Sequence, residues 1–500
     1  MRLAATLLSM WLLIARPISA QTGIVYDQAR AQYWEAMAAA RVQGLPALIR
    51  QLEAVTAAFP ASPVKPLVFE TILAVALLHP GSVPDDERRW QTMKSQLGSN
   101  PELARSVQRV EIFRAYLAKA GAGDAGPAGA TLSDPVFEGS ILGRLAQADA
   151  AFRLGEYDRA QDLARLAIEL DPYSPLLANA YAVLGLCAAY EGQMASAARF
   201  LQQALAITPL ETLRGSTQSL LATALRFLRP ATAAAGNSVF QNIAVTRLAG
   251  IDGLKDPRTM LFSDGKYWLL DRERLLAISP SGGVTETRQL RRLEDFSPLR
   301  PTGFYFLAEK DIEIAGARMA QLSASVAGRT RLLDRLRSVA LDPAGVPYVL
   351  DEDRGIFRVM SAAGTAAAAE QVNPTKGRML RIDARGYIYL LTHDRKSVAV
   401  LSRSGSMLAD IRPSSVGGKN PSIEHFALDL LNHLYILDTE GNSIQIFAIN
   451  SLAGRLEVNP VVVITLEQRP QFKDLKVMAV SDTGEMALTG KNENSWVLFK

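Results

Sequence analysis

The spacing of apolar residues divides the chain into two parts. Between about Tyr26 and Pro230 they recur every three or four positions, with Pro or Gly between the runs, which predicts a succession of amphipathic α-helices. After the small-residue linker Ala231–Gly236 they alternate over short runs, which predicts β-strands. We therefore expect a multidomain protein with an all-α domain at residues 21–236 and an all-β domain at residues 237–500.

The helical part begins with segments that carry no repeated motif. The first two segments form a candidate helix pair that ends at Pro60, and the small-residue stretch Gly121–Ala130 predicts a flexible break after the last. The expected helices are Ala29–Val42, Leu45–Phe59, Phe69–Leu78, Asp86–Leu97 and Glu102–Ala120.

A motif that occurs twice follows this break. The first copy begins at Gly155 and the second at Gly192, 37 residues later. The copies read Gly155-Glu156-Tyr157, Ala160, Ala164, Ala167, Ile168, Pro172, and Gly192-Gln193-Met194, Ala197, Leu201, Ala204, Leu205, Pro209. Small residues at these offsets allow two helices to approach closely, and the proline ends the second helix of each pair.

This motif resembles the tetratricopeptide repeat, whose unit is a helix-turn-helix of ~34 residues. The resemblance is specific over Leu142–Pro209 and departs from the family pattern at Arg144, where a large apolar residue is expected. It implies a concave surface that binds peptides or proteins. The alternative is that these helices only space or cap the second domain.

The β part also repeats a motif. Each copy reads as a strand, a tight turn containing Asp, a second strand, a third strand and Gly, and the clear copies begin at Ala340, Arg381 and Ala427. Weaker copies begin at Phe262 and Val480. The turn Gly or Asn positions 265, 345, 386, 432 and 484 are separated by 80, 41, 46 and 52 residues, so the first gap leaves room for one hidden unit near 302–320. The pattern predicts six units.

Units of ~40–50 residues with about four strands predict a β-propeller, because one such sheet must stack on its neighbours to bury both faces. The Asp-x-x-Gly turn before a Tyr-containing strand resembles the NHL-type blade over Gln241–Lys500. The chain ends on the third strand of the last blade, so we expect a strand within Val239–Leu248 to complete it and remove the open edge. A β-sandwich is the alternative, but it would not repeat a turn motif in register.

Composition narrows the possible functions. Charged residues make up 21% and the formal charge is +4, or +2 without Arg2 and Arg16, which is too close to neutral for a nucleic-acid binder that relies on overall charge. The single cysteine, Cys187, excludes an internal disulfide and a cysteine-based zinc site.

The first twenty residues predict a signal peptide. Arg2 precedes an apolar run from Leu3 to Ala15, and Ser19-Ala20 provides a small-residue cleavage site. A membrane anchor is the alternative, but the run is shorter than the ~20 residues that span a bilayer. We expect an exported protein, periplasmic or extracellular, with no membrane span.

Catalytic chemistry is not expected from the visible motifs. The aspartates that recur in the turns, Asp342, Asp383 and Asp429, are interpreted as structural, because Asp in such turns bonds to backbone N–H groups and a catalytic group is needed only once. Of the four histidines, His393, His425 and His433 fall in adjacent units at different depths, so we expect neither convergence on a metal nor a cofactor. The enzymatic alternative is a metal-dependent lactonase or a lyase, since propellers of this kind include both.

One column of the alignment predicts a binding surface. An apolar residue precedes the turn in each unit, and the position four residues before it is the expected start of the innermost strand. The residues at this position are Arg258, Arg337, Arg378, Glu424 and Lys476. In NHL-type propellers this rim commonly meets the ligand. The resemblance therefore implies that Arg258, Arg337, Arg378 and Lys476 attract an acidic peptide or glycan.

These observations predict an exported, non-enzymatic binding or scaffold protein. Its tetratricopeptide-like helices would bind a protein or peptide, and the rim of a six-bladed propeller would bind a second partner.

Overall fold

The computed structural model describes most of the chain. The described residues are 20–43, 45–78, 86–95, 101–121, 135–137, 139–170, 174, 176–208, 211–228, 239–240, 242–249, 253–290, 293–298, 303–308, 311–314, 317–326, 329–343, 345–360, 367–452, 455–466, 474–490 and 495–500. Residues 1–19 of the predicted signal peptide, residues 122–130 of the predicted break and the linker at 231–236 lie outside them. No helix in the described ranges is long and apolar enough to cross a membrane.

The first half is helical, as the apolar spacing predicts. Within the described ranges it contains ten α-helices and one short 3-10 helix, and the predicted segments ahead of residue 121 all lie within or across helices of the structure. These elements are α2 (Ala20–Gln43), α3 (Leu45–Ala58), α4 (Lys65–Leu78), α5 (Asp86–Ser95), α6 (Pro101–Gly121), η2 (Pro135–Phe137), α8 (Ile141–Leu154), α9 (Tyr157–Leu170), α10 (Leu177–Tyr190), α11 (Met194–Ile207) and α12 (Glu211–Phe227).

The twice-repeated motif forms two helix pairs, α8 with α9 and α10 with α11, and α10 also packs against both α8 and α9. Gly155 and Gly192 occupy the turn inside each pair, and both have φ of +80°, a conformation that favours glycine. Gly185 lets α10 approach α11 closely, because a Cβ at this position would lie 2.8 Å from Leu201 Cγ. The small residues therefore set the distance between helices.

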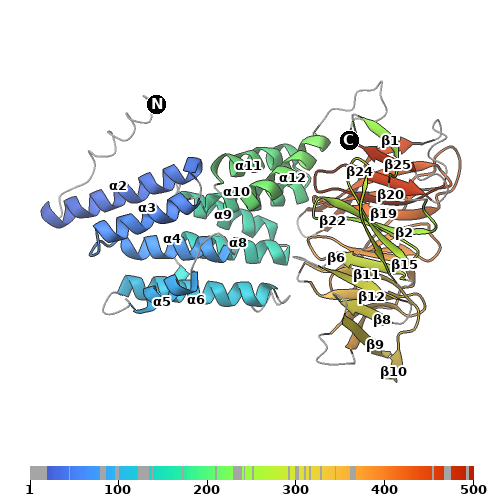
Figure 1. Ribbon diagram of the computed structural model, residues 1–500, viewed down its shortest axis with the longest axis horizontal. Coiled ribbons are helices and arrows are strands. Elements are labelled where there is room, and N and C mark those ends of the chain that lie inside the picture. Colours follow the sequence, from blue (N-terminus) through green and yellow to red (C-terminus); the bar gives the residue numbers. More distant parts are fainter. Residues whose placement is uncertain are drawn as a thin grey trace.

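The second half consists of β-strands arranged in five sheets (Figure 1). Four sheets have four strands each, and the fifth has nine. The strands are β1 (Ile243–Arg247), β2 (Pro257–Ser263), β3 (Lys266–Asp271), β4 (Arg274–Ile278), β5 (Val284–Gln289), β6 (Asp295–Pro298), β7 (Phe304–Leu307), β8 (Asp311–Ile314), β9 (Ala317–Val326), β10 (Arg329–Leu332), β11 (Leu336–Leu341), β12 (Pro347–Asp351), β13 (Gly355–Val359), β14 (Ala367–Asn373), β15 (Gly377–Ile382), β16 (Ile388–Thr392), β17 (Val398–Leu401), β18 (Met407–Ile411), β19 (Ile423–Leu428), β20 (His433–Asp438), β21 (Ser443–Leu452), β22 (Arg455–Thr465), β23 (Leu475–Val480), β24 (Met486–Gly490) and β25 (Ser495–Phe499).

The number of sheets differs from the predicted six units. The nine-stranded sheet contains two antiparallel runs, β6–β9 and β11–β14. They are joined because Ala367–Ala369 of β14 pair in parallel with Leu322–Ala324 of β9. The first of these runs lies where the sequence leaves room for a hidden unit. Turn motifs report where a unit begins, but the pairing of two outer strands far apart in the chain leaves no such signal.

The sheets surround an axis, which makes this half a β-propeller. The innermost strands contact one another in the closed order β2, β6, β11, β15, β19, β23 and back to β2. The last sheet is completed by β1, which pairs antiparallel with β25 from Ile243 opposite Phe499 to Arg247 opposite Ser495. The predicted strand within 239–248 therefore closes the sheet and protects the edge of β25.

The helices pack against one end of the propeller (Figure 1). The Thr223 hydroxyl of α12 donates to Asp482 O at 3.2 Å, and the Phe227 ring stacks on His433 with centroids 3.6 Å apart. Arg403, in the turn after β17, donates to Arg153 O of α8 at 3.1 Å. Asp482 follows the innermost strand β23, Arg403 follows the third strand β17, and His433 begins β20 directly after the turn that follows β19. That end of the propeller therefore faces the helices, and the strand starts face away from them.

Candidate functional site

The five residues of the predicted rim column occupy equivalent places. Each is the second residue of an innermost strand, and in each strand the pairing register shifts between the first and third residues. The residues are Arg258 in β2, Arg337 in β11, Arg378 in β15, Glu424 in β19 and Lys476 in β23. A β-bulge re-aims the side chain of the extra residue, so a common bulge gives the five side chains a common setting.

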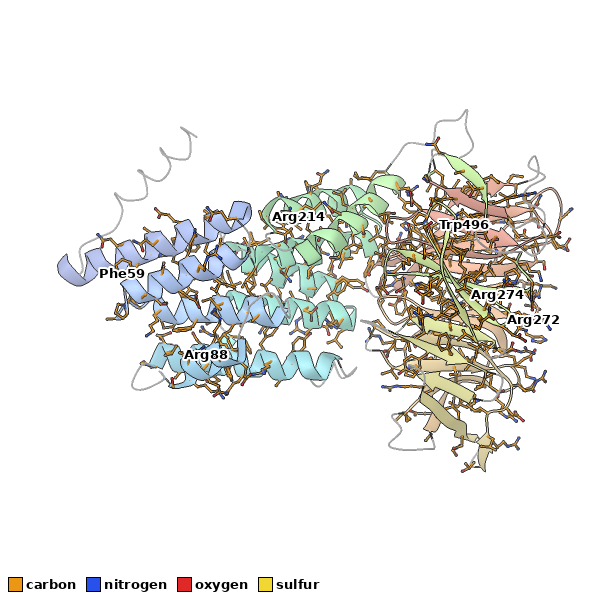
Figure 2. All side chains as sticks on the ribbon, viewed as in Figure 1. Phe59, Arg88, Arg214, Arg272, Arg274 and Trp496 are labelled. Atoms are coloured by element: carbon orange, nitrogen blue, oxygen red, sulfur yellow. The ribbon has the colours of Figure 1, made fainter. Side chains whose placement is uncertain are left out.

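The rim faces away from the helices. The first residue of β2, Pro257, pairs with Asp271 at the end of β3, so the strand starts and the β3–β4 turns share one end of the propeller. Figure 2 shows Arg272 and Arg274, which belong to that turn and to the start of β4, on the side opposite the helices.

Acidic side chains lie among the basic residues of the rim. Arg258 Nη1 is 2.8 Å from a Glu294 carboxylate oxygen, and Arg337 lies 3.1 Å from Glu294 and 3.0 Å from Glu352. Burial alone would lower the pKa of Arg337, but the hydrogen bonds and charges of Glu352 and Glu294 together outweigh it and raise the pKa. Glu424 binds Arg395 at 2.6 Å. This part of the rim is a chain of ion pairs.

Arg378 and Lys476 differ from the other basic rim residues. Arg378 is exposed, and its Nε donates to the backbone oxygen of His393 at 3.0 Å. Lys476 is half-buried. Within the part of the chain that the structure describes, no ion pair to an acidic group is present for either residue.

A buried polar network crosses the axis of the propeller. Arg381 of β15 donates from Nη1 to Asp295 of β6 at 3.0 Å and from Nη2 to the Thr259 hydroxyl of β2. The Ser338 hydroxyl of β11 also donates to Asp295, at 2.5 Å. Arg381 is 8% exposed and the other three are 3% exposed or less. One guanidinium therefore links four innermost strands. Arg381 could not be recognised as a site residue from the sequence, because these contacts span up to 122 residues.

His425 of β19 is buried beside this network. It is 3% exposed, and neither ring nitrogen has a partner of normal hydrogen-bond geometry among the described residues, although the Phe426 backbone opposes the lowering of its pKa slightly. Burial, followed by the positive charge of Arg381, holds the pKa of His425 well below its usual range. The imidazole is therefore neutral at physiological pH.

The three histidines considered as metal ligands lie in different surroundings. His425 is near the axis, and His433 is buried against Phe227 with its Nδ1 2.8 Å from Asp429. His393 is in an exposed turn. Among the described residues, no group of three or more His, Cys, Asp or Glu side chains is arranged to hold a metal ion.

The recurrent turn aspartates bind the backbone, as predicted. Asp383 accepts from the backbone N–H groups of Arg385 and Tyr387 at 2.9 and 3.0 Å. Asp429 accepts from Leu431 N and His433 N, both at 2.9 Å, and Asp342 accepts from Val346 N at 2.9 Å. Their role is to fix the turns.

Arg385, inside one of these turns, is an important residue that sequence reasoning missed. Its Nε donates to Asp383 at 2.9 Å, its Nη1 donates to Ile449 O at 2.8 Å, and its guanidinium lies 5.4 Å from the ring centroid of Tyr190 in α10. Burial alone would lower the pKa of Arg385, but the Asp383 charge and the neighbouring tyrosines, of which Tyr389 has the largest effect, together outweigh it and raise the pKa. The available signal was a basic residue at a turn position where the other clear copies have Ala344 and Leu431.

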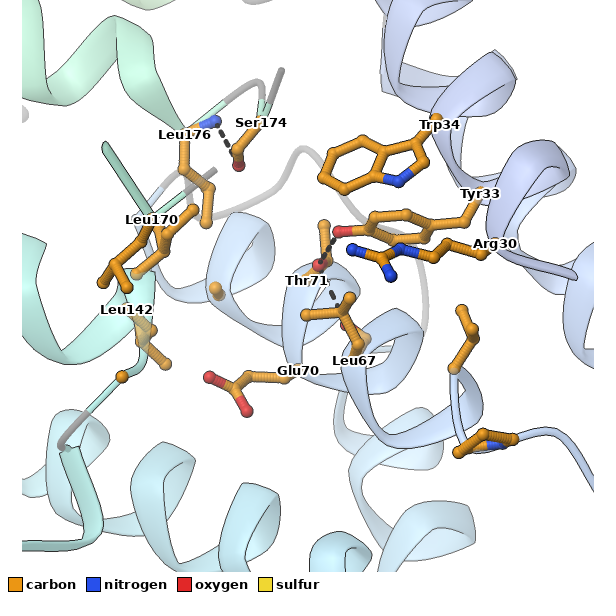
Figure 3. Close-up of a pocket in the computed structure, with 15 residues that line it drawn as sticks. Arg30, Tyr33, Trp34, Leu67, Glu70, Thr71, Leu142, Leu170, Ser174 and Leu176 are labelled. Carbon is orange, nitrogen blue, oxygen red and sulfur yellow. Dashed lines mark hydrogen bonds between the residues drawn. The ribbon is translucent and has the colours of Figure 1, made fainter. Parts of the chain in front are cut away.

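The helical half contains a pocket of about 270 Å³ between α2, α4 and the start of α8 (Figure 3). Its walls combine apolar side chains with polar groups that include Arg30, Glu70 and Thr71. Trp34 is half-buried, while Leu67 and Leu170 are 43% and 44% exposed. The pocket lining comprises Arg30, Tyr33, Trp34, Pro63, Val64, Leu67, Glu70, Thr71, Ala74, Gly139, Ile141, Leu142, Leu170, Ser174 and Leu176.

The polar groups of the pocket mostly hold the helices together. Tyr33 of α2 and Thr71 of α4 share a hydrogen bond of 3.1 Å (Figure 3). The Glu70 carboxylate accepts from Ser106, Arg109 and Ser140 at 2.8–2.9 Å, which ties α4 to α6 and to the start of α8. Because these donors already bind Glu70, the exposed side chains Leu67 and Leu170 are the part of the lining that an apolar partner could cover.

No protein-family model matches the chain, and no curated protein matches it. Among solved structures, the streptogramin B lyase structure is 9% identical with a TM-score of 0.36, and the match covers 52% of this chain and 98% of that one. Selenomethionine-substituted virginiamycin B lyase from Staphylococcus aureus is 10% identical with a TM-score of 0.34, covering 52% and 99%. The WD40 domain of Neurospora crassa Pan2 is 12% identical with a TM-score of 0.31, covering 51% and 94%. Similarity at these values carries no argument about activity.

Proposed function

We propose that this protein is an exported, non-enzymatic binding protein that holds a segment of a partner protein in the pocket of its helical half. The observation that carries the proposal is the pocket between α2, α4 and α8, with the exposed leucines Leu67 and Leu170 in its walls. The repeated motif supports it, because tetratricopeptide-like arrays leave a concave surface free for peptides.

The size and lining of the pocket favour apolar side chains of a peptide over a cofactor. Its volume of about 270 Å³ lies below the usual range for small-molecule sites and suits one or two aliphatic side chains. A partner segment with two neighbouring apolar residues would cover Leu67 and Leu170 and remove both from water. Burial of such side chains is the general source of affinity in grooves between helices.

A displayed peptide library selected against the protein spanning residues 21–500 tests this function. We expect the selected peptides to contain paired apolar residues and to lose binding to Leu67→Arg, which places a charge in the pocket wall. Leu166→Arg is the matched control, because Leu166 is 42% exposed on α9 and does not line the pocket. Peptides that bind all three proteins equally would contradict the proposal.

A second binding surface is proposed at the rim of an NHL-like propeller, for an acidic peptide or glycan. The specific support is that Arg378 and Lys476 form no ion pair with a described acidic residue, whereas Arg258 and Arg337 are paired with Glu294. Arg378→Glu is expected to weaken binding of a polyglutamate peptide. Arg159→Glu, an exposed change on α9, is the control. Equal affinity of both variants would exclude Arg378 from the surface.

Export is the remaining part of the proposal. The supporting observation is the cationic start, apolar run and small-residue exit of residues 1–20. Sequencing the N-terminus of the protein purified from its native cells tests it, with Gln21 expected as the first residue. A protein that retains Met1 would contradict cleavage.

A further inference from the structure

Two side chains near the axis of the propeller have hydrogen-bonding nitrogens that no described residue binds. These nitrogens are Nε of Arg381 and both ring nitrogens of His425. Arg381 is 8% exposed and His425 is 3% exposed. Native proteins seldom leave buried polar groups without a partner, so three such nitrogens on two neighbouring side chains are a feature that points to a ligand.

We propose that the axis of the propeller binds a small carboxylate through Arg381 and His425. One carboxylate oxygen accepts from Arg381 Nε–H and the other accepts from an N–H of His425. This site is separate from both surfaces of the proposed function, because neither the helical pocket nor the basic rim column includes these two residues.

The chemistry of the site selects an anion with two acceptor oxygens. The other nitrogens of Arg381 each have a partner, Nη1 in Asp295 and Nη2 in Thr259, whereas Nε has none among the described residues. Nε–H is a hydrogen-bond donor and offers no lone pair to a cation. Guanidinium groups suit planar carboxylates, and formate and acetate are the smallest carboxylates with which to test so buried a site.

Charge balance couples carboxylate binding to a proton. Arg381 and Asp295 neutralise each other, so an incoming carboxylate adds one uncompensated negative charge beside a neutral His425. Uptake of one proton from the buffer by the imidazole restores neutrality, and no covalent bond forms or breaks. The charged rim residues on β19 and on its neighbour β23 are Glu424, which is bound to Arg395, and Lys476.

The path to the site begins at the rim. His425 directly follows the rim residue Glu424, and Arg381 follows Arg378 by three residues along β15. At about 3.3 Å per residue, His425 is therefore one step from the strand starts and the Arg381 backbone about 10 Å away. A small anion reaches the two side chains from the end of the propeller that faces away from the helices.

Isothermal titration of the protein spanning residues 21–500 with formate and acetate tests this inference. We expect the dissociation constant to rise about tenfold from about pH 6 to about pH 7, since one proton is bound with the ligand. Titration in two buffers with different ionisation enthalpies is expected to give an uptake of about one proton. His425→Gln is expected to bind at least about tenfold more weakly and without pH dependence. His393→Gln, in an exposed turn, is the control and should match the wild-type protein.

Several results would overturn the inference. No binding of formate or acetate up to about 50 mM would mean that the nitrogens contact only water. Equal affinity in His425→Gln, or a dissociation constant independent of pH, would remove His425 from the site. Equal binding of chloride would exclude recognition of a planar carboxylate. Thermal unfolding of His425→Gln at about pH 8 establishes that the variant is folded, so that lost binding reports on the site.

Discussion

Replacement of His425 by Gln is expected to change how the stability of the propeller depends on pH. His425 is buried, and burial and the Arg381 charge hold its pKa well below the ordinary value of 6.5. In the unfolded chain the imidazole is hydrated and takes up a proton as the pH falls through about 6.5. Below that pH the unfolded state binds a proton that the native state does not bind, so the wild-type protein loses stability on acidification.

The magnitude follows from this difference. Each pH unit between the unfolded and native pKa values costs about 1.4 kcal/mol of the free energy of unfolding. From about pH 6.5 to about pH 5, the wild-type protein therefore loses about 2 kcal/mol through His425 alone. Gln cannot take up this proton. The stability of His425→Gln relative to wild type should accordingly rise by about 2 kcal/mol between about pH 8 and about pH 5.

Urea unfolding in buffers without carboxylates, followed by tryptophan fluorescence, measures this difference. Trp268 and Trp496 are buried in the propeller and report on its unfolding. Comparison with wild type cancels the contribution of the carboxylates that both proteins share. His393→Gln is the matched control and should stay parallel to wild type. If the His425→Gln and wild-type stabilities also remain parallel from about pH 8 to about pH 5, the assigned native state of His425 is wrong.

Three further changes test the propeller and its contact with the helices. Asn242 and Lys500 exchange two backbone hydrogen bonds, so every second residue from Asn242, including Thr246, directs its N–H at β25. Thr246→Pro removes one such bond and is expected to lower the free energy of unfolding by about 1–3 kcal/mol. The Val245 N–H points to the open side of β1, so Val245→Pro should cost less in the same urea assay. Replacing the buried Arg385 by Met should lower the free energy of unfolding by about 3–5 kcal/mol, because it leaves the Asp383 carboxylate buried without its partner. A double-mutant cycle that also substitutes Tyr190 measures the cation–π contact, and absence of coupling would show that this contact is unimportant. Gly355→Ala should lower the melting temperature more than Gly345→Ala. Both glycines have positive φ, but only at Gly355 would an added Cβ meet the backbone, at 2.2 Å from Asn373 O. Equal changes in melting temperature would contradict this packing.

The sequence predicted those features that depend on neighbouring residues. The apolar spacing located helices such as α3 and α4, because a helix buries one face with a period of about 3.6 residues. The recurrent turn placed Asp342, Asp383 and Asp429 on backbone N–H groups, since those bonds form within four residues. The repeated motif also aligned the rim positions with the bulges of the innermost strands.

The tertiary structure decided the features that depend on contacts between distant segments. The parallel pairing of β14 with β9 produced a nine-stranded sheet, and Glu294 became the partner of both Arg258 and Arg337. The same holds for Arg381, which bonds to residues 43 to 122 positions away. No local spacing records which strands meet around an axis, so the charge of the rim and the chemistry of the axis follow only from the closed propeller.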